Sequence, residues 1–355
     1  MAWIASLKIW QKFLLIGAVA AAMALPPAVM LVRAKVGEVT SAREELAGIA
    51  PAADLLRLVR LTQQHRGLSA GMLGGNAEMV AAREKVQAEV QAALAQAIAS
   101  AARYQGGPAL VELQAEWETI ARAVGTRQWQ PPESFARHTA LVARQLRWLE
   151  QVLDRSTLAL DPAAATYYTI IATLDKSPWL TELLGQLRGR GALALARKAL
   201  PDDERLGLAA TMAQARTRQA EARSALEKAT AADATVGGVL AGPLKSADEQ
   251  HEALMARIER DLLGAAGPNG SAPDFFKAAT AAIDARFGLS TPPWPTSASA
   301  WRRAPPTRAT NSSSRWRWWS SPPCSAPRSW WRSRAAWWAR CARPGPPPTR
   351  WPAAT

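Results

Sequence analysis

Between Val36 and Phe287, apolar residues recur every three or four positions, and almost no stretch alternates apolar with polar residues. This spacing collects apolar side chains on one face of a helix, whereas alternation is typical of a half-buried strand. Short breaks divide the region, among them Gly106 to Pro108 and Gln130 to Ser134. Because short connections make neighbouring helices antiparallel, we predict an all-α fold of antiparallel helical bundles over residues 36–287. Such a fold lacks the sheet on which a nucleotide-binding crossover is mounted.

Several local signals predict where individual helices begin or end. Asn76 is expected to cap the second helix of the region, and Asp161-Pro162 is expected to open a later one. The helical pattern resumes after Ser177-Pro178, and Gly237-Gly238 is expected to bound a further helix.

The segment 13–32 contains twenty uncharged residues, with Lys8 and Lys12 before it and Arg33 and Lys35 after it. A helix of this length spans about 30 Å, the thickness of a membrane's hydrocarbon core. A cleaved signal peptide is the alternative, but the apolar core of a signal peptide is shorter. We therefore predict a transmembrane helix behind a cytoplasmic N-terminus at residues 1–12. The flanking positive charges are nearly balanced, so they determine the orientation only weakly.

The tail, residues 290–355, differs in composition from the rest of the chain. It carries eleven Arg and no Asp, Glu or Lys, so most of the formal charge of +14 lies there. It also holds both cysteines, Cys324 and Cys341, and ten of the sixteen tryptophans. The remaining body has no cysteine, which excludes a disulfide framework and a thiolate metal site from it.

Tryptophan pairs in the tail suggest that it is translated in the wrong reading frame. The pairs stand at Trp318-Trp319, Trp330-Trp331 and Trp337-Trp338, among Arg, Ser and Pro. In a GC-rich gene, a shifted frame turns Trp and Ser codons into Val or Leu codons and turns Arg and Pro codons into Ala or Pro codons. Applied from Trp316 to Ala335, this shift yields an apolar run long enough for a second membrane helix. Around residues 341–346 it permits the Thr-Arg-Pro that resembles the start of a HAMP linker.

The alternative is that the tail is real, and that a membrane-anchored basic protein uses it on nucleic acid or anionic lipid. That alternative predicts a codon-position bias that matches the tail's own frame, whereas the frameshift hypothesis predicts that the bias moves. We favour the frameshift because it also explains the tryptophan pairs, and we expect no nucleic-acid partner.

Two strings in the body resemble a known sensor family. Gln63 to Gly71 reads Gln-Gln-His-Arg-Gly-Leu-Ser-Ala-Gly, which resembles the signature of nitrate- and nitrite-sensing (NIT) domains and of related sensor modules in methyl-accepting chemotaxis proteins. Leu160 to Ala192, which includes Gly-Gln-Leu-Arg-Gly-Arg-Gly-Ala, resembles the later part of such sensor regions. Together the resemblances cover roughly residues 50–200.

The resemblance implies that a small anion is the ligand, with nitrate and nitrite as the candidates. It also implies a ligand-binding set of residues: Arg66, His65, Ser69, Arg188 and Arg190. A guanidinium presents a planar fork that binds an oxyanion through two bonds, which suits Arg66 to this role. The alternative for Arg66 is a structural salt bridge, beside small residues that allow close helix packing. For Arg188 and Arg190, the residues alone favour a solvated face flanked by packing glycines.

The sequence offers no catalytic constellation. His65, His138 and His251 stand isolated, with no second ligand at metal spacing. We therefore expect no metal, no cofactor and no enzymatic activity.

Together these features predict a transmembrane chemoreceptor sensor that binds a small ligand and transmits a signal across the membrane. The resemblance implies a homodimer in the bacterial inner membrane, with the helical NIT-like domain in the periplasm. The same sensor attached to a membrane histidine kinase or a cyclase is the alternative within signalling proteins. The sequence does not identify the output domain.

Overall fold

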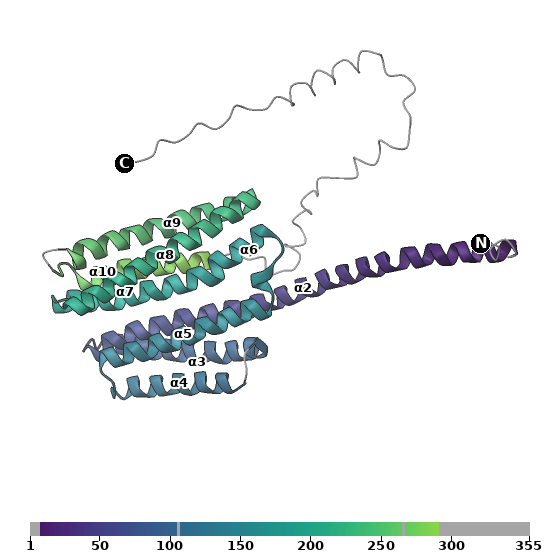
Figure 1. Cartoon of the computed structure of the whole chain (residues 1–355). Coiled ribbons are helices and arrows are strands. Elements are labelled where there is room, and N and C mark those ends of the chain that lie inside the picture. The colour runs from purple at the N-terminus through teal and green to yellow at the C-terminus, as the bar shows by residue number, and fades with distance from the viewer. Residues whose placement is uncertain (1–7, 105–106, 265–266, 291–355) are drawn as a thin grey trace, which may run out of the picture. The chain divides into compact units, whose positions relative to one another are not determined.

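The computed structural model describes residues 8–104, 107–264 and 267–290. These residues form helices joined by short connections, and the described ranges contain no strand, which confirms the predicted all-α fold (Figure 1). The tail with its tryptophan pairs lies outside the described residues, so the frameshift remains a prediction.

Helix α2 runs without interruption from Ile9 to Leu73, a length of 65 residues. At 1.5 Å per residue it is about 98 Å long. The sequence predicted a membrane helix followed by a separate first helix of the bundle, but the structure joins the two. Residues 33–48 between them contain no proline and are rich in good helix formers such as Ala, Glu and Lys, so nothing there ends the helix. Pro26, Pro27 and Pro51 lie inside it.

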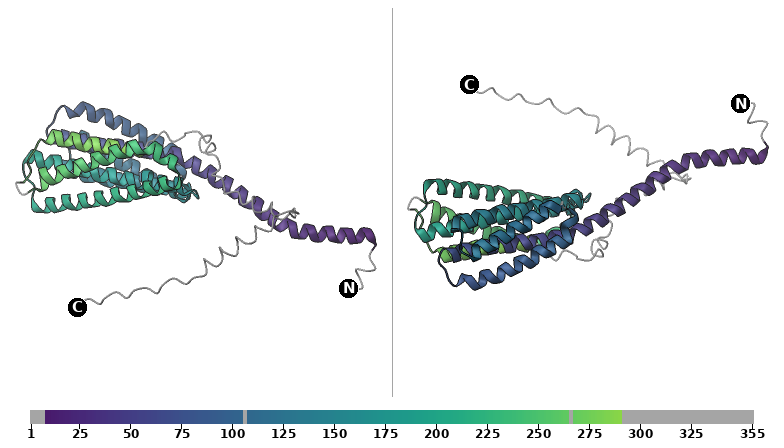
Figure 2. Two further views of the ribbon diagram at one scale, coloured as in Figure 1. Left: turned by 90° about the horizontal axis from the view of Figure 1, so that it is seen from above. Right: turned by 90° about the horizontal axis from the view of Figure 1, so that it is seen from below.

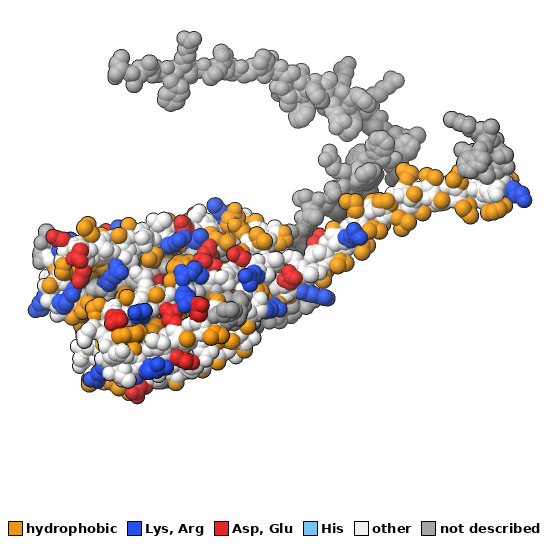
Figure 3. Space-filling view, turned by 60° about the horizontal axis from the view of Figure 1, so that its bottom comes forward, with side chains coloured by type: hydrophobic (Ala, Val, Ile, Leu, Met, Phe, Trp, Pro, Cys, Tyr) orange, Lys and Arg blue, Asp and Glu red, His pale blue; other side chains and the backbone are white. Residues whose placement is uncertain are grey.

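The N-terminal part of α2 is apolar and exposed. An 18-residue window of this helix has a mean hydropathy of 2.2, and none of the window is buried. Phe13 is 70% exposed and Met23 is 75% exposed, and Figure 3 shows hydrophobic side chains along this part of the helix. By length and composition, α2 is able to cross a membrane.

The first bundle consists of the C-terminal part of α2 with three further helices: α3 (Met79–Ala101), α4 (Gly107–Gly125) and α5 (Pro131–Arg155). The helices run alternately up and down, as their short connections require (Figure 1). Their core is closed by leucines and by two fully buried tryptophans, Trp117 and Trp148. Helix α3 begins three residues after the predicted cap Asn76, whose side chain instead accepts a hydrogen bond from the Glu78 N–H at 3.0 Å.

The second bundle is built by the rest of the described chain. Its elements are α6 (Ala164–Ile170), the π-helical turn η3 (Ile171–Lys176), α7 (Ser177–Arg197), α8 (Asp202–Ala232), α9 (Ala234–Ile258), the π-helical turn η4 (Glu259–Leu263) and α10 (Ala272–Ser290). Two short 3-10 turns, η1 (Ala102–Tyr104) and η2 (Leu158–Leu160), lie in the connections of the first bundle and between the bundles.

One predicted boundary of the second bundle is wrong, and the other, at Ser177-Pro178, coincides with the start of α7. Gly237-Gly238 lies inside α9, and the chain breaks instead at Asp233, whose carboxylate accepts a hydrogen bond from the Thr235 N–H at 2.9 Å. Helix propensity is a weak prior that packing overrides, and Gly237 packs against Thr230. At Ser177-Pro178 helical structure continues, because proline is tolerated in the first turn of α7.

The two bundles meet along a seam between α2 and α5 on one side and α7 on the other. Val59 of α2 and Val142 of α5 belong to the same apolar cluster as Leu180 and Leu184 of α7. Helix α7 contacts both α2 and α5, and Figure 2 shows the packed helices from two further sides. Buried polar side chains of the first sequence string, Arg66 among them, lie in this seam.

Candidate anion site in the seam between the bundles

Arg66 points from α2 into the seam and is 1% exposed. Its Nη1 donates to Glu182 Oε1 at 2.6 Å, and its Nη2 donates to Glu182 Oε2 at 3.1 Å. Nη1 also donates to the Thr139 hydroxyl at 2.8 Å. The bidentate ion pair therefore joins α2 to α7, while Thr139 ties the same guanidinium to α5. Such charge-assisted pairs combine strength with fixed geometry.

The surroundings of the Arg66 guanidinium hold it in place. Its central carbon lies 4.8 Å from the centre of the Phe135 ring, which forms a cation–π contact. A Cβ added to Gly185 would lie only 2.7 Å from Arg66 Nη2. Gly185 belongs to the second sequence string, so the two strings that carry the family resemblance meet at this point.

Glu182 is buried and collects donors from both bundles. Its exposure is 2%, and besides Arg66 it accepts bonds from Gln63 Nε2 at 3.1 Å and Gln186 Nε2 at 2.9 Å. Sequence reasoning missed Glu182. Its only signal was its position three residues before Gly185, because its partner Arg66 lies 116 positions away in the chain.

Arg188 is buried rather than solvated, which corrects the preference stated from the residues alone. It is 7% exposed, and its guanidinium lies 4.7 Å from the centre of the Phe276 ring. Its Nη1 donates to the Thr280 hydroxyl at 3.0 Å, and its Nη2 lies 3.5 Å from the Gln63 carbonyl oxygen. Because α10 packs over α7, a position that periodicity alone left open to water is covered.

No carboxylate among the described residues makes an ion pair with Arg188. Its pKa is lowered to about 10, mainly by burial and then by repulsion from Arg66, while Asp284 and Glu182 oppose the shift. Asp284 itself pairs with the exposed Arg60 at 2.9 Å. Of the two buried guanidinium groups, only that of Arg66 is paired with a buried carboxylate, so the positive charge of Arg188 has no ion-pair partner among the described residues.

Small residues allow the two arginines to approach the helix backbones. A Cβ added to Gly67 would lie 3.4 Å from Arg188 Nη2. The glycine after Arg66 and the glycine three residues before Arg188 therefore each face the other helix's guanidinium. A small acceptor placed here would meet guanidinium donors from Arg66 on α2 and Arg188 on α7.

His65 and His138 form a buried hydrogen-bonded pair, so these histidines are not isolated as the sequence suggested. The His65 Nδ1 and His138 Nε2 atoms lie 2.8 Å apart, although the residues are 73 positions apart in the chain. The Ser134 carbonyl oxygen lies 2.7 Å from His138 Nδ1. A carbonyl oxygen only accepts, so His138 carries its proton on Nδ1 and accepts the His65 Nδ1–H on Nε2.

Both histidines are neutral in this fold. Burial lowers the pKa of His65 to about 2, with repulsion from His138 and Arg83 adding to the effect. Burial lowers the pKa of His138 to about 4, against the hydrogen bond to Ser134. The pair therefore acts as an uncharged link between α2 and α5.

The other predicted site residues lie apart from the two arginines. The Ser69 hydroxyl is buried 3.3 Å from His65 Nδ1, and the His65 ring stands edge-on to Trp117 at 5.0 Å, inside the first bundle. Arg190 is exposed, and its Nη1 lies 3.4 Å from the Thr211 hydroxyl. Of the predicted set, the structure brings only Arg66 and Arg188 together in the seam.

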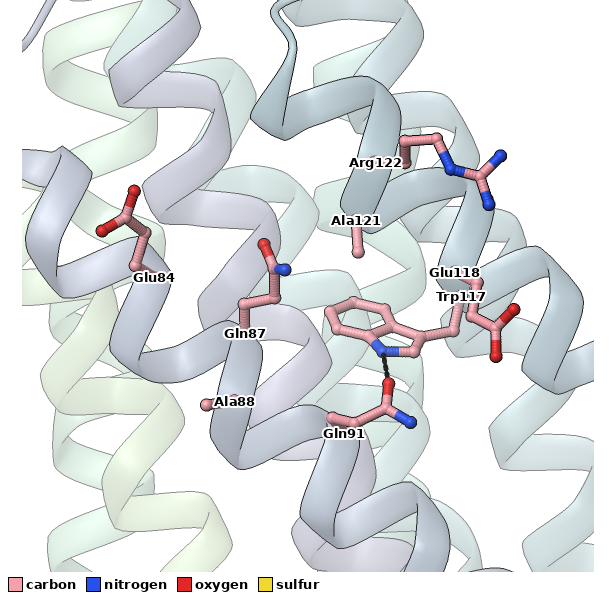
Figure 4. Close-up of a pocket in the computed structure, with 8 residues that line it drawn as sticks. All are labelled: Glu84, Gln87, Ala88, Gln91, Trp117, Glu118, Ala121 and Arg122. Carbon is pink, nitrogen blue, oxygen red and sulfur yellow. Dashed lines mark hydrogen bonds between the residues drawn. The ribbon is translucent and has the colours of Figure 1, made fainter.

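A groove of about 560 Å³ opens elsewhere, between α3 and α4 (Figure 4). The Trp117 indole forms part of its wall and donates from Nε1 to Gln91 Oε1 at 2.8 Å. Glu84 and Glu118 line it together with Arg122, so its charge does not favour an anion. The described residues contain no group of three His, Cys, Asp or Glu that could hold a metal ion. We place the candidate site at the arginines because a buried, uncompensated charge needs a partner more than an open groove does.

Comparisons with known proteins show the family to which the chain belongs. Residues 57–289 match the family described as "Nitrate and nitrite sensing" (NIT), and this range includes both arginines. No curated protein matched. Among solved structures, the chain is similar to the NasR transcription antiterminator, with a TM-score of 0.59 and 18% identity over 75% of this chain and 71% of that one. That similarity shows the shared fold of the helices. Because the family match spans most of the chain and covers both bundles, the chain belongs to the nitrate and nitrite sensing family.

Proposed function

We propose that this protein is a membrane-anchored sensor of a small oxyanion, nitrate or nitrite, which it binds with Arg66 and Arg188. The observation that carries the proposal is that two buried guanidinium groups lie in the seam and only Arg66 is paired with a carboxylate there, that of Glu182. A bound monovalent anion would neutralise the remaining positive charge. Burying an unpaired charge raises the free energy of the folded protein, and binding of an anion would offset that cost.

The chemistry of nitrate and nitrite suits this seam. Both ions are small and carry one negative charge on oxygens that can accept two bonds from one guanidinium. Thr139 and Thr280 add hydroxyl groups next to Arg66 and Arg188.

The continuity of α2 supports a role in signalling across a membrane. Arg66 stands on the same uninterrupted helix as the apolar segment 13–32. A change in packing between α2 and α7 would therefore move a rigid rod that leads directly into the membrane, and a ligand that favours one packing would shift the population towards it. We propose that the bundles lie in the periplasm of a bacterium and that the apolar segment anchors them in the inner membrane.

A homodimer is part of this proposal. Val36 and Val39 stand beyond the apolar segment and are 59% and 53% exposed on α2. A second copy of the helix would cover such a stripe. For the output we favour chemotaxis signalling, as the resemblance implied, with a histidine kinase or cyclase as the alternative. NasR is an antiterminator, so the fold itself does not select the output.

Nitrate titration of the purified full chain in detergent tests the ligand. The parent protein should gain thermal stability with sodium nitrate or nitrite relative to sodium chloride at equal ionic strength, by about 2.7 kcal/mol at a hundredfold excess over Kd. Arg66→Ala should weaken nitrate binding at least tenfold, which corresponds to about 1.4 kcal/mol or more. The control is Arg60→Ala, because Arg60 is on the same helix but its ion pair is exposed. A parent that responds equally to nitrate, nitrite and chloride would refute the proposal.

A further inference from the structure

The Glu182 carboxylate already occupies the bidentate face of Arg66. Its two oxygens accept from Nη1 and Nη2 at 2.6 and 3.1 Å, the arrangement that a nitrate ion would adopt on the same guanidinium. Both groups are planar, carry one negative charge and offer two oxygens on one edge. The Nη1–Nη2 edge of Arg66 is therefore not free for a ligand in this structure.

We propose that Glu182 is an internal competitor for the anion, and that the ligand binds Arg66 by displacing the Glu182 carboxylate. The inference rests on the proposed function and adds how the site is regulated. It makes Glu182 the residue that sets both the affinity for the anion and the link between binding and helix packing.

Charge explains why the exchange is possible. Arg66 keeps one anionic partner before and after the exchange, so its burial is compensated in both states. The ligand is also attracted by the positive charge of Arg188. Arg188 has no ion-pair partner among the described residues, and burial together with repulsion from Arg66 lowers its pKa. An external anion therefore competes with Glu182 at a place where one carboxylate does not neutralise two guanidinium groups.

The exchange would alter the contact between α2 and α7. Glu182 stands on α7 and accepts from both Gln63 and Arg66, which stand on α2. These hydrogen bonds join α2 to α7 across the seam. When the carboxylate leaves, Gln63 loses its acceptor and the link opens, which couples ligand binding to the rod that carries the apolar segment.

A second buried arginine provides a matched control. Arg286 on α10 is fully buried, and its Nη2 donates to Asp248 Oδ1 of α9 at 3.1 Å. This pair belongs to the second bundle, away from the seam. Asp248→Asn and Glu182→Gln therefore each remove one carboxylate from a buried arginine, but only Glu182→Gln empties the proposed site.

The experiment compares the parent, Glu182→Gln and Asp248→Asn as full chains in detergent, with sodium nitrate against sodium chloride. Both variants should unfold at a lower temperature than the parent in chloride, because removal of one partner strands a buried charge. Nitrate should restore the stability of Glu182→Gln and should bind it at least tenfold more tightly than the parent, since the competing charge is gone. Asp248→Asn should bind nitrate with the affinity of the parent.

Three outcomes overturn the inference. Nitrate binding to Glu182→Gln that equals or falls below binding to the parent would show that Glu182 positions Arg66 instead of competing with the ligand. Equal rescue of Asp248→Asn by nitrate would show that any stranded arginine responds. If neither the parent nor Glu182→Gln responds to nitrate, the proposed function fails as well, so the two failures are distinguishable.

The inference remains testable if Glu182→Gln does not fold in chloride. Purification in nitrate should then yield folded protein, because the anion takes the place of the carboxylate. If nitrate does not rescue folding either, Glu182→Asp decides. The shorter side chain keeps the charge but withdraws it from Arg66, so nitrate should bind this variant more tightly than the parent. Unchanged or weaker binding would overturn the proposal.

Discussion

Gly185 of α7 lies against the Arg66 guanidinium of α2, so that a Cβ on Gly185 would stand 2.7 Å from Arg66 Nη2. This contact explains why a glycine stands in the middle of a buried helix, where it costs about 1 kcal/mol relative to alanine. The absence of a side chain gives Arg66 the room in which it meets Glu182.

Gly185→Ala should therefore lower the affinity for nitrate by roughly tenfold, because the guanidinium must shift away from α7 and cannot keep its present geometry. The gain in helix propensity, about 1 kcal/mol, offsets part of the strain, so the loss in stability should be small. Calorimetric titration and thermal unfolding measure the two effects. Gly238→Ala is the control, because nothing lies within 4 Å of its added Cβ. Equal nitrate affinity in both variants would contradict the role of Gly185.

Arg188→Gln should separate ligand binding from stability. Arg188 makes no ion pair with a described carboxylate, so its loss strands no buried acid, and it also removes a repulsion from Arg66. The variant should bind nitrate at least tenfold more weakly, while its unfolding temperature in chloride should fall less than that of Arg66→Ala. Arg190→Gln serves as the control, since Arg190 is exposed on the same helix. If Arg188→Gln bound nitrate like the parent, the site would rest on Arg66 alone.

The stability of the folded chain should decrease as the pH falls from about 6.5 towards 4. Burial and repulsion from Arg286 lower the pKa of His251 to about 4, so between these values the unfolded chain binds a proton there that the folded chain does not. Each such group reduces the free energy of unfolding by about 1.4 kcal/mol per pH unit in this window. His138, whose pKa is also lowered to about 4, contributes in the same direction.

His251→Leu should flatten this pH dependence by the contribution of one proton. Among the described residues, neither ring nitrogen of His251 has a hydrogen-bond partner, so the substitution removes no hydrogen bond observed there. Chemical denaturation at several pH values measures the slope. A slope unchanged by the substitution would mean that His251 is already protonated, or solvated, in the folded protein.

The apolar part of α2 should hold the protein in membranes. Two charges near the middle of the segment, Val19→Lys with Met23→Lys, should release the chain from the membrane fraction after extraction at high pH, since each charge costs about 2.5 kcal/mol or more at the centre of a membrane helix. Val239→Lys, at a position that is 62% exposed on α9, should remain with the parent in the pellet. Retention of the doubly charged variant would argue against a membrane-spanning helix.

Local patterns in the sequence determined the helices, and the resemblance to the family pointed to Arg66 as a candidate site residue. Helices arise from hydrogen bonds between residues four apart, and their apolar faces repeat with that spacing, so the all-α fold was predictable. The apolar segment 13–32 was recognisable by composition for the same local reason. The boundaries at Asn76 and Gly237-Gly238 were wrong because cap and glycine preferences amount to about 1 kcal/mol, which packing overrides.

Only the tertiary structure decided which distant side chains meet. Glu182 pairs with Arg66 across 116 positions, and His65 meets His138 across 73. Arg188 looked solvated in the sequence, but α10 packs over it and leaves its charge without an ion-pair partner. Such contacts depend on how whole helix faces pack together. A charged residue looks the same in the sequence whether it contacts water or a carboxylate on another helix. The sequence could therefore point to the arginine, whereas the packing of the two bundles decided that Glu182 faces it.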